Sequence, residues 1–477
     1  MNNSYLMSFS GLSQALGARL IAGEGNQDEG FTSVSIDSRE VFPGALFVAL
    51  RGCNLDGHSF VDAAFRAGAS GALVDFPALE NPLFGLSALA QKWNKVLIAV
   101  EDTLKALQEA ARTYLKQFTG LLKIGITGST GKTTTKEIAA AIIGQEKSVV
   151  MNKGNLNSET GLPLSVFNVR AHHEVGIFEA GMNRKGEISE LAGVLNPDIA
   201  LITNIGSAHI GILGSREAIA EEKKKIFSQF TGNNTALIPV EDDYRDFLAD
   251  GVRGRKVFYG ASSFSGLDGI KDLGLFGTEI CWEGKKAHFN LPGKFNLQNA
   301  LAGIALAREL ALSSESIRRG LESAKPLFGR GEILSGRATV IRDCYNSNPE
   351  SAEAALDFCD NLEWPGRKVY VMGSMLELGE ASAESHAVLG KRLAACRADK
   401  VFLFGEEMFP AADAFKETIV SGRRVPFFYT RDKHELSQAL GEYVAKGDLV
   451  LLKGSRGCEL EVLTEILTAE KGDLGVS

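Results

Sequence analysis

The stretch TGSTGKTTT (127–135) stands between the apolar run LLKIGIT (121–127) and the helical pattern KEIAAAII (136–143). A glycine-rich turn between a buried strand and a helix is the setting of a phosphate-binding loop. The glycines let backbone N–H groups approach phosphate oxygens, and the helix N-terminus adds partial positive charge. The sequence therefore predicts a nucleotide-binding α/β domain built around this loop.

Two side chains of the loop have separate predicted roles. The Lys132 ammonium reaches the outer phosphates of ATP, and the Thr133 hydroxyl ligates Mg²⁺. Ile126 stands where the usual spacing puts the first glycine, but Gly125 and Gly128 flank that position. We expect ATP to be held by the loop residues Gly128, Ser129, Thr130, Gly131, Lys132, Thr133 and Thr134.

Two groups of short apolar runs, each followed by a helical pattern, indicate two separate parallel sheets. The first group is LLKIGIT (121–127), VGIFEA (175–180) and IALITN (199–204). The second group is TVIRD (339–343), KVYVMG (368–373), KVFLFG (400–405) and LVLLKG (449–454). Before residue 100, short strands surround a Pro43-Gly44 turn and precede the helical stretch SFVDAAFRAGA (59–69).

A chain of 477 residues is too long for one ordinary core, so we expect an α/β protein of three domains. These are a small N-terminal α/β substrate domain (1–105), a central P-loop ATPase-like parallel-sheet domain (106–325) and a C-terminal Rossmann-like domain (326–477). The first boundary follows from the amphipathic stretch TLKALQEAARTYLKQF (103–118), which leads into the first strong strand. Lys325-Pro326 interrupts the pattern at the second boundary.

Composition excludes several functional classes. The formal charge of −8 argues against a general nucleic-acid binder, which needs a basic surface. The N-terminus has no basic segment followed by an apolar one, and no transmembrane segment is expected, so we predict a cytoplasmic protein. Scattered cysteines without a CxxC pair indicate neither a zinc site nor a disulfide framework: Cys53, Cys281, Cys344, Cys359, Cys396 and Cys458.

Polar residues at the ends of apolar strands are the further site candidates, because ligands of open α/β sheets lie at the carboxyl ends of the strands. Glu179, Asn204 and Asp343 occupy such positions. Glu179 either holds Mg²⁺ or is a solvated acid, and His209 is either a ligand or a hydrogen-bonded structural group. We expect the strand before His209 to lie beside that of Glu179. The lysines of SREAIAEEKKKIF (215–227), taken alone, form a solvated helix face.

The chain resembles the Mur ligases, ATP-dependent amide-forming enzymes of peptidoglycan precursor synthesis. Their phosphate loop reads T-G-[ST]-x-G-K-T, as residues 127–133 do here. The resemblance covers essentially the whole length and includes motifs typical of members that add D-Ala-D-Ala to UDP-MurNAc-tripeptide. These motifs are SIDSR (35–39), LFVALRGCNLDGHSF (46–60), GNLNSETGLPL (154–164), EAGMNRKGEI (179–188), NIGSAHIG (204–211), DCYNSNP (343–349), MLELGE (375–380) and KGSRG (453–457).

The resemblance implies roles for individual residues. It implies carbamylation of Lys223, which then supports a second Mg²⁺, although Lys224 and Lys225 follow where the family has Gly and Glu. The implied catalytic residues are Lys132, Glu179, His209, Lys223 and Arg330, and the implied metal ligands are Thr133, Glu179, His209 and Lys223. Asn299 is expected at the adenine, Arg330 at the γ-phosphate and Asp343 at the ribose; a helix cap, a surface charge and a turn former are the alternatives.

The resemblance also implies where the other substrates bind. The UDP end of the substrate is expected at Ser38, Arg39, Asn54, Asp56, Gly57 and His58. Asp56-Gly57 is alternatively only a tight turn. The dipeptide is expected at Asn346, Asn348, Ser455 and Arg456. Departures from the family pattern are Ser158 for an asparagine, Ser347 for an alanine and Ser374 for an acid.

The implied reaction is amide formation through an acyl phosphate, by a monomer whose C-terminal domain swings onto the central one. Two rival hypotheses remain at this stage. One is a related ligase for another acyl acceptor, such as a folylpolyglutamate synthase. The other is a nucleotide-dependent switch that hydrolyses ATP without making a bond.

Overall fold

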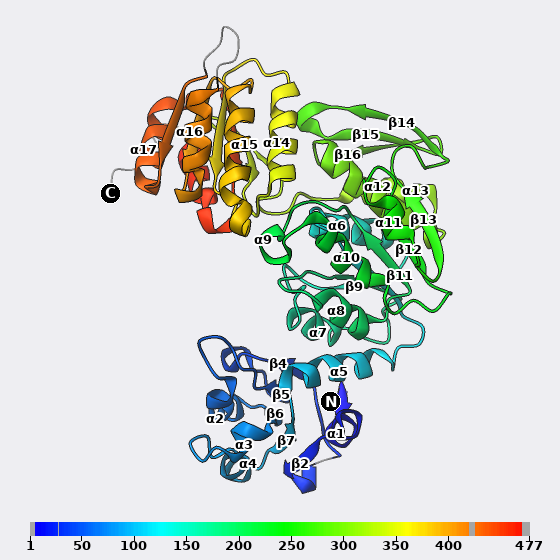
Figure 1. The fold of residues 1–477 in the computed structure, drawn as a ribbon. Coiled ribbons are helices and arrows are strands. Elements are labelled where there is room, and N and C mark those ends of the chain that lie inside the picture. The colour runs from blue at the N-terminus through cyan, green and yellow to red at the C-terminus, as the bar shows by residue number, and fades with distance from the viewer. Residues whose placement is uncertain (1–4, 27, 419–424, 470–477) are drawn as a thin grey trace.

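The computed structural model describes residues 5–26, 28–418 and 425–469, and three α/β units follow one another along the molecule (Figure 1). The predicted α/β class is confirmed. The outer ends of the first and third predicted domains, residues 1–4 and 470–477, lie outside the described residues. The predicted division at 105 and 325 stays a prediction. The first of these positions falls within a helix, Thr103–Leu115.

The N-terminal unit is a five-stranded sheet of order β2-β7-β6-β5-β4, in which only β2 runs antiparallel to its neighbour. Its strands are β2 (Arg19–Ala22), β4 (Ser33–Ser35), β5 (Ala45–Val48), β6 (Gly71–Asp75) and β7 (Val96–Val100). A separate pair is β1 (Met7–Ser8) with β3 (Gly30–Phe31). The helices are α1 (Phe9–Leu16), α2 (Val61–Arg66), α3 (Phe76–Glu80), α4 (Leu86–Trp93) and α5 (Thr103–Leu115), of which α5 packs into the core of the next unit.

The central unit is a six-stranded, fully parallel sheet of order β13-β12-β11-β8-β10-β9. Its strands are β8 (Leu122–Thr127), β9 (Val149–Met151), β10 (Val175–Glu179), β11 (Ile199–Ile202), β12 (Thr235–Pro239) and β13 (Arg255–Tyr259). One face packs on α6 (Lys132–Ile143), α12 (Lys294–Glu309) and α13 (Ser314–Ser323). The other elements are α7 (Gly161–Val166), α8 (Glu187–Leu195), α9 (Ile210–Leu213), α10 (Arg216–Lys224) and α11 (Arg245–Ala249).

The expected order of two central strands was wrong. The strand before His209, β11, does not lie beside the strand of Glu179, β10, because β8 lies between them and pairs with both. The chain leaves β8 on one side and returns on the other, so the phosphate loop after β8 sits at the switch point of the sheet. Glu179 and the loop carrying His209 therefore flank the phosphate loop from opposite sides.

An antiparallel sheet that the sequence analysis did not predict follows the central one. It consists of β14 (Leu267–Asp272), β15 (Thr278–Trp282) and β16 (Lys285–Phe289) in that order. Buried and exposed residues alternate along β15 and β16, and Trp282 is buried in the core beneath α12. This alternation was the available sequence signal.

The C-terminal unit has the strand order β17-β18-β22-β19-β20-β21, parallel except for the pair β17 and β18. The strands are β17 (Glu332–Leu334), β18 (Thr339–Asp343), β19 (Lys368–Gly373), β20 (Lys400–Phe404), β21 (Phe427–Thr430) and β22 (Leu449–Lys453). The helices are α14 (Pro349–Asn361), α15 (Ser382–Ala394), α16 (Phe409–Glu417), α17 (Lys433–Tyr443) and α18 (Thr464–Thr468). Both predicted groups of strands are thus confirmed.

Two surface properties bear on function. Within the described ranges, none of the helices is long and apolar enough to cross a membrane.

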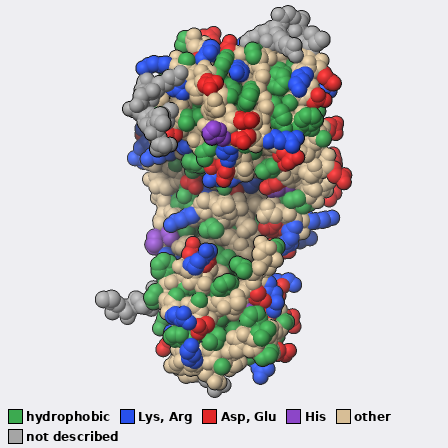
Figure 2. All heavy atoms as spheres, turned by 90° about the vertical axis from the view of Figure 1, so that its left-hand side faces the viewer, with side chains coloured by type: hydrophobic (Ala, Val, Ile, Leu, Met, Phe, Trp, Pro, Cys, Tyr) green, Lys and Arg blue, Asp and Glu red, His purple; other side chains and the backbone are tan. Residues whose placement is uncertain are grey.

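On the face in Figure 2, acidic and basic side chains are interspersed rather than gathered by sign. This face therefore offers no broad basic footprint of the kind that nucleic-acid binding requires.

Candidate active site

The phosphate loop connects the end of β8 to the start of α6. Gly128 and Gly131 have φ values of 148° and 78°, which are left-handed backbone conformations that favour glycine. A Cβ at Gly131 would overlap the side-chain oxygen of Asn299. Asn299 is buried on α12 and closes one side of the loop, and its role at the adenine stays a prediction.

The loop that follows β11 braces the phosphate loop. The Asn204 side chain accepts a hydrogen bond from the Thr130 N–H at 3.0 Å and donates one to the Thr130 hydroxyl at 2.8 Å. The Gly206 N–H donates to Ser129 Oγ at 2.8 Å. These hydrogen bonds engage the side chains of Ser129 and Thr130 and so hold the phosphate loop in its shape without a bound nucleotide.

A cavity of about 530 Å³ opens above the phosphate loop, between the central and C-terminal units. It brings together most of the residues that the sequence predicted for ATP, metal and dipeptide. The predicted residues that line it are Ser129, Thr130, Gly131, Lys132, Thr133, Thr134, Glu179, His209, Asn299, Arg330, Asp343, Asn346 and Asn348. The predicted residues Gly128, Lys223, Ser455 and Arg456 do not line the cavity, and Lys223 instead contacts the Gly128 carbonyl oxygen.

Glu179 is a buried carboxylate at the carboxyl end of β10. Its Oε1 accepts a hydrogen bond from Asn157 Nδ2 at 2.6 Å, whereas its buried Oε2 has no hydrogen-bond partner. The Asn152 side chain holds the backbone by accepting from the Glu179 N–H at 2.9 Å. A buried carboxylate oxygen without a partner is costly unless a cation or a donor completes it.

His209 adopts a left-handed backbone conformation, with φ of 67°, at the start of α9. Burial, followed by the charges of Lys132 and Lys223, lowers the pKa of His209 to about 3. Its ring is therefore neutral near pH 7, the form that binds metal. Its Nδ1 is buried without a hydrogen-bond partner and lies 3.4 Å from Glu377 Oε2 of the C-terminal unit.

Lys223 lies on α10 behind the phosphate loop and is almost fully buried. Its Nζ donates a hydrogen bond to the Gly128 carbonyl oxygen at 2.9 Å. Burial, followed by the charge of Lys132, lowers the pKa of Lys223 well below the usual lysine range, so a neutral amine is accessible. The adjacent lysines point elsewhere: Lys224 donates to the Phe247 carbonyl oxygen, and Lys225 pairs with Glu222.

The donor set includes oxygen atoms that suit a hard divalent cation. Within the part of the chain that the structure describes, three or more His, Cys, Asp and Glu side chains never gather as a metal cluster. Glu179 nevertheless offers an uncompensated buried oxygen, and the Thr133 hydroxyl and the neutral His209 line the same cavity. Oxygen ligands with room for water are what Mg²⁺ prefers. The residues present therefore fit the predicted cation.

The C-terminal unit contributes the opposite wall of the cavity. The Arg330 guanidinium lies 4.0 Å from the centre of the Tyr345 ring, and Asp343 pairs with the buried Lys453 at 3.1 Å. Asn348 caps α14 by accepting from the Ser351 N–H. The remaining dipeptide candidates already have partners within this unit: Ser455 Oγ accepts from the Leu376 N–H, and Arg456 pairs with Glu461.

The residues predicted for the UDP end lie in the N-terminal unit, outside this cavity. Asp56 accepts hydrogen bonds from the His58 N–H and lies 2.6 Å from His58 Nδ1, while the buried His58 ring accepts from the Asp75 N–H. His58 therefore orders the loop. Arg39 pairs with Asp37 on the surface, next to Ser38 in a short 3₁₀ helix. Asn54 and Gly57 belong to the same loop as Asp56.

Several residues around the site are not among those predicted from the sequence. Asn157, Glu350, Glu377 and Lys453 all line the cavity or contact a predicted site residue. Each lies within or next to a quoted motif, but motif membership alone does not say which side chain turns toward the nucleotide. These side chains reach the cavity only because the fold brings distant segments of the chain together.

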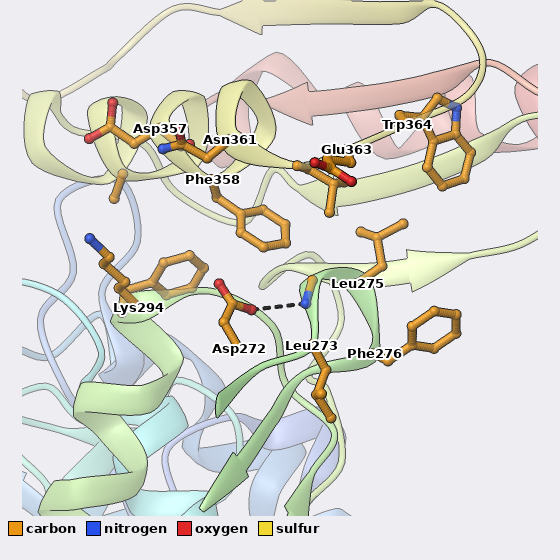
Figure 3. A pocket seen from close by; sticks show the side chains of 14 residues that line it. Asp272, Leu273, Leu275, Phe276, Lys294, Asp357, Phe358, Asn361, Glu363 and Trp364 are labelled. Carbon is orange, nitrogen blue, oxygen red and sulfur yellow. Dashed lines mark hydrogen bonds between the residues drawn. The ribbon is translucent and has the colours of Figure 1, made fainter. Parts of the chain in front are cut away.

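A larger cavity of about 630 Å³ lies elsewhere between the two units (Figure 3). It is bounded by the turn Asp272–Phe276 of the antiparallel sheet and by α14 with the loop to Trp364. Figure 3 shows Phe358 and Leu275 turned toward the space between these elements. None of the phosphate-loop residues lines it, so it is separate from the nucleotide cavity.

Comparison with known proteins agrees with this arrangement of three units and one nucleotide cavity. Residues 30–115 match the catalytic domain of the Mur ligase family, residues 126–307 the Mur ligase middle domain, and residues 329–456 the Mur ligase, glutamate ligase domain. The chain belongs to the Mur ligase family. The recognition of this family from its motifs is thereby confirmed, as is the three-domain α/β fold.

Relatives and solved structures of this family match over nearly the full length. The UDP-N-acetylmuramoyl-tripeptide--D-alanyl-D-alanine ligase of Treponema pallidum (strain Nichols) is 44% identical over 98% of this chain and 100% of its own. A crystal structure of MurF from Acinetobacter baumannii has a TM-score of 0.85 and 27% identity, covering 97% of this chain and 98% of that one. MurF from Thermotoga maritima, solved in complex with ADP, has a TM-score of 0.76 and 29% identity, covering 91% and 97%. This Mur ligase is accordingly an ATP-using ligase.

Proposed function

We propose that this enzyme joins D-Ala-D-Ala to UDP-MurNAc-tripeptide and so forms UDP-MurNAc-pentapeptide. One observation carries the proposal: the phosphate loop, Glu179 and the C-terminal Arg330 all line one cavity, and Glu179 Oε2 is buried there without a hydrogen-bond partner. The name of the Treponema pallidum relative supports the same reaction. The N-terminal unit would hold the UDP end, and the C-terminal unit would receive the dipeptide.

The reaction proceeds in two displacements. The terminal carboxylate of the tripeptide attacks the γ-phosphorus of ATP, which breaks the bond to the β-phosphate oxygen and releases ADP. The dipeptide amine then attacks the acyl carbon of the acyl phosphate, loses a proton and expels inorganic phosphate. Both steps depend on positioning and charge neutralisation, which Lys132 and Arg330 supply from opposite walls of the cavity.

Four residues would hold two Mg²⁺ ions. Thr133, Glu179 and His209 offer a hydroxyl, a carboxylate oxygen and a neutral ring nitrogen, and Lys223 would contribute as a carbamate. Bound Mg²⁺ would neutralise charge on the phosphates. The lowered pKa of Lys223 supports carbamylation, because only a neutral amine captures CO₂. The carbamate replaces a cation with an anionic, two-oxygen ligand.

The test is release of phosphate from ATP and Mg²⁺ with UDP-MurNAc-tripeptides that differ in the third residue, each with and without D-Ala-D-Ala. Release that needs both partners, together with a pentapeptide product by mass, is the expected result. Release indifferent to the dipeptide would support the switch instead. Strong activity with folate and glutamate would support a folylpolyglutamate synthase. The preferred tripeptide identifies the third stem residue.

The proposal includes the setting in which the enzyme works. Its substrates are small molecules, no nucleic acid takes part, and we place the protein in the cytoplasm as a monomer. Size-exclusion chromatography with light scattering tests the monomer, since a dimer would double the mass from 51.1 kDa.

A further inference from the structure

The Glu350 carboxylate of the C-terminal unit binds the loop after β11, which is itself hydrogen-bonded to the phosphate loop. Glu350, the second residue of α14, accepts two hydrogen bonds from Ser207, a residue 143 positions earlier in the chain. The Ser207 N–H donates to Glu350 Oε1 and the Ser207 hydroxyl donates to Oε2, each at 2.8 Å. Ser207 is buried and belongs to the central unit, between β11 and α9.

Ser207 lies next to residues that contact the nucleotide site. Its neighbour Gly206 donates its N–H to Ser129 Oγ at 2.8 Å, and Ser129 belongs to the phosphate loop. His209 follows Ser207 by two residues, and burial, followed by the charge of Lys132, lowers the pKa of its ring. A shift of Ser207 would therefore displace both Gly206, which bonds Ser129, and His209, because each lies within two residues of it.

The fit between the two units around this contact is close. A Cβ on Gly206 would lie 3.1 Å from the Glu350 carboxyl carbon, tighter than ordinary packing. Further along the same loop, Gly211 and Gly379 approach so closely that a side chain on either would meet backbone of the other. The loop 206–211 is thus a docking point for the C-terminal unit, and Glu350 supplies its pair of charge-assisted hydrogen bonds.

We propose that Glu350 is a positioning residue that couples docking of the C-terminal unit to the shape of the phosphate loop and the place of His209. It acts through Ser207 and need not touch the reacting atoms. The proposal rests on the proposed ligase function, because it assigns Glu350 a part in assembling that site. When the C-terminal unit docks, the bonds to Ser207 hold the loop in its reactive position.

The variants Glu350→Ala, Ser207→Ala and the double variant test this coupling in the ligase assay. Loss of both hydrogen bonds to the carboxylate is expected to lower kcat about tenfold in Glu350→Ala, with a smaller change in KM for D-Ala-D-Ala. Ser207→Ala keeps the backbone N–H bond and should lower kcat less. The double variant should be no slower than Glu350→Ala, because the two residues act through one contact. Glu350→Gln, whose amide can still accept from the Ser207 N–H, should fall between the wild type and Glu350→Ala.

Glu353→Ala is the matched control, because Glu353 lies on the same helix but pairs with Arg392 inside the C-terminal unit. Equal kcat values for Glu350→Ala and Glu353→Ala would overturn the proposal, as would single-variant effects that multiply in the double variant. These outcomes have meaning only where the wild type needs the dipeptide to release phosphate, so failure of the proposed function is seen first and separately.

A second measurement is independent of ligase activity. X-ray scattering of the whole protein with Mg²⁺ and ADP should give a larger radius of gyration for Glu350→Ala than for the wild type and for Glu353→Ala. A residue important only for the folding of α14 would lower the unfolding temperature instead and leave the scattering curve of the folded protein unchanged. Coincident curves for the three proteins would therefore also overturn the proposal.

Discussion

The Lys223 Nζ lies 2.9 Å from the carbonyl oxygen of Gly128, so a buried lysine of α10 contacts the phosphate loop. Of three consecutive lysines, this one alone points to the nucleotide site; Lys224 reaches the Phe247 carbonyl oxygen and Lys225 reaches Glu222. The helix geometry thereby distinguishes three lysines that the charge run alone does not separate, although the family resemblance already names Lys223.

Replacing Lys223 by Ala should lower kcat about 100-fold, since the proposed metal-supporting group is lost. Millimolar acetate should restore part of the activity of this variant, because its carboxylate offers the same two oxygens as a carbamate. Initial rates of phosphate release measure both effects. Lys224→Ala is the control and should keep near wild-type rates. A fully active Lys223→Ala protein would exclude the carbamate.

Replacing Gly131 by Ala should abolish nucleotide binding while leaving the protein folded. The new Cβ would overlap Asn299 at a position whose φ is 78°, so the loop has to move away from the phosphates. Titration with a fluorescent ADP analogue measures the affinity. Gly193→Ala on α8 serves as the control, because a Cβ there meets no atom within 4 Å. Unchanged affinity in the Gly131 variant would contradict the assigned loop geometry.

Replacing Arg330 by Ala should lower kcat about 100- to 1,000-fold, the usual effect of removing a preorganised donor to developing charge. Tyr345→Leu should have a smaller effect, because the ring lies 4.0 Å from the guanidinium and would act by orienting it, whereas Arg330 is the proposed phosphate contact. Steady-state kinetics in saturating ATP measure both. The exposed Arg319 of α13, changed to Ala, is the control. Equal rates for the Arg330 and Arg319 variants would remove Arg330 from the mechanism.

Acidification should destabilise the protein in part through Glu146. The hydroxyls of Ser316 and Ser313 lower the pKa of Glu146 from its ordinary 4.5 to about 2. A lowered pKa means that the unfolded chain binds the proton first, so this stabilisation is present above pH 4.5 and is lost as the pH falls toward 2. The urea midpoint of Glu146→Gln should therefore fall less steeply between about pH 5 and about pH 3 than that of the wild type. Parallel slopes would contradict this.

Much of the site could be read from local sequence because its chemistry is local. Residues 127–135 hold the turn, the helix start, Lys132 and Thr133 in one short segment, and strand, loop and helix follow from neighbouring residues. Glu179 could be found for a similar reason, because a polar residue that ends an apolar strand must emerge at the carboxyl edge of a parallel sheet. No such rule exists for Glu350, which acts on a loop in another unit.

By itself the sequence determined the fold class, the two parallel sheets, the phosphate loop and the Mur ligase family, since these depend on short-range patterns and on motifs in order. Only the tertiary structure decided that β8 separates the strands of Glu179 and His209, that Lys223 rather than its neighbours reaches the loop, and that Glu350 binds Ser207. Those relationships join residues far apart in the chain. They arise from crossover connections and packing between units, which no local pattern of apolar and polar residues records.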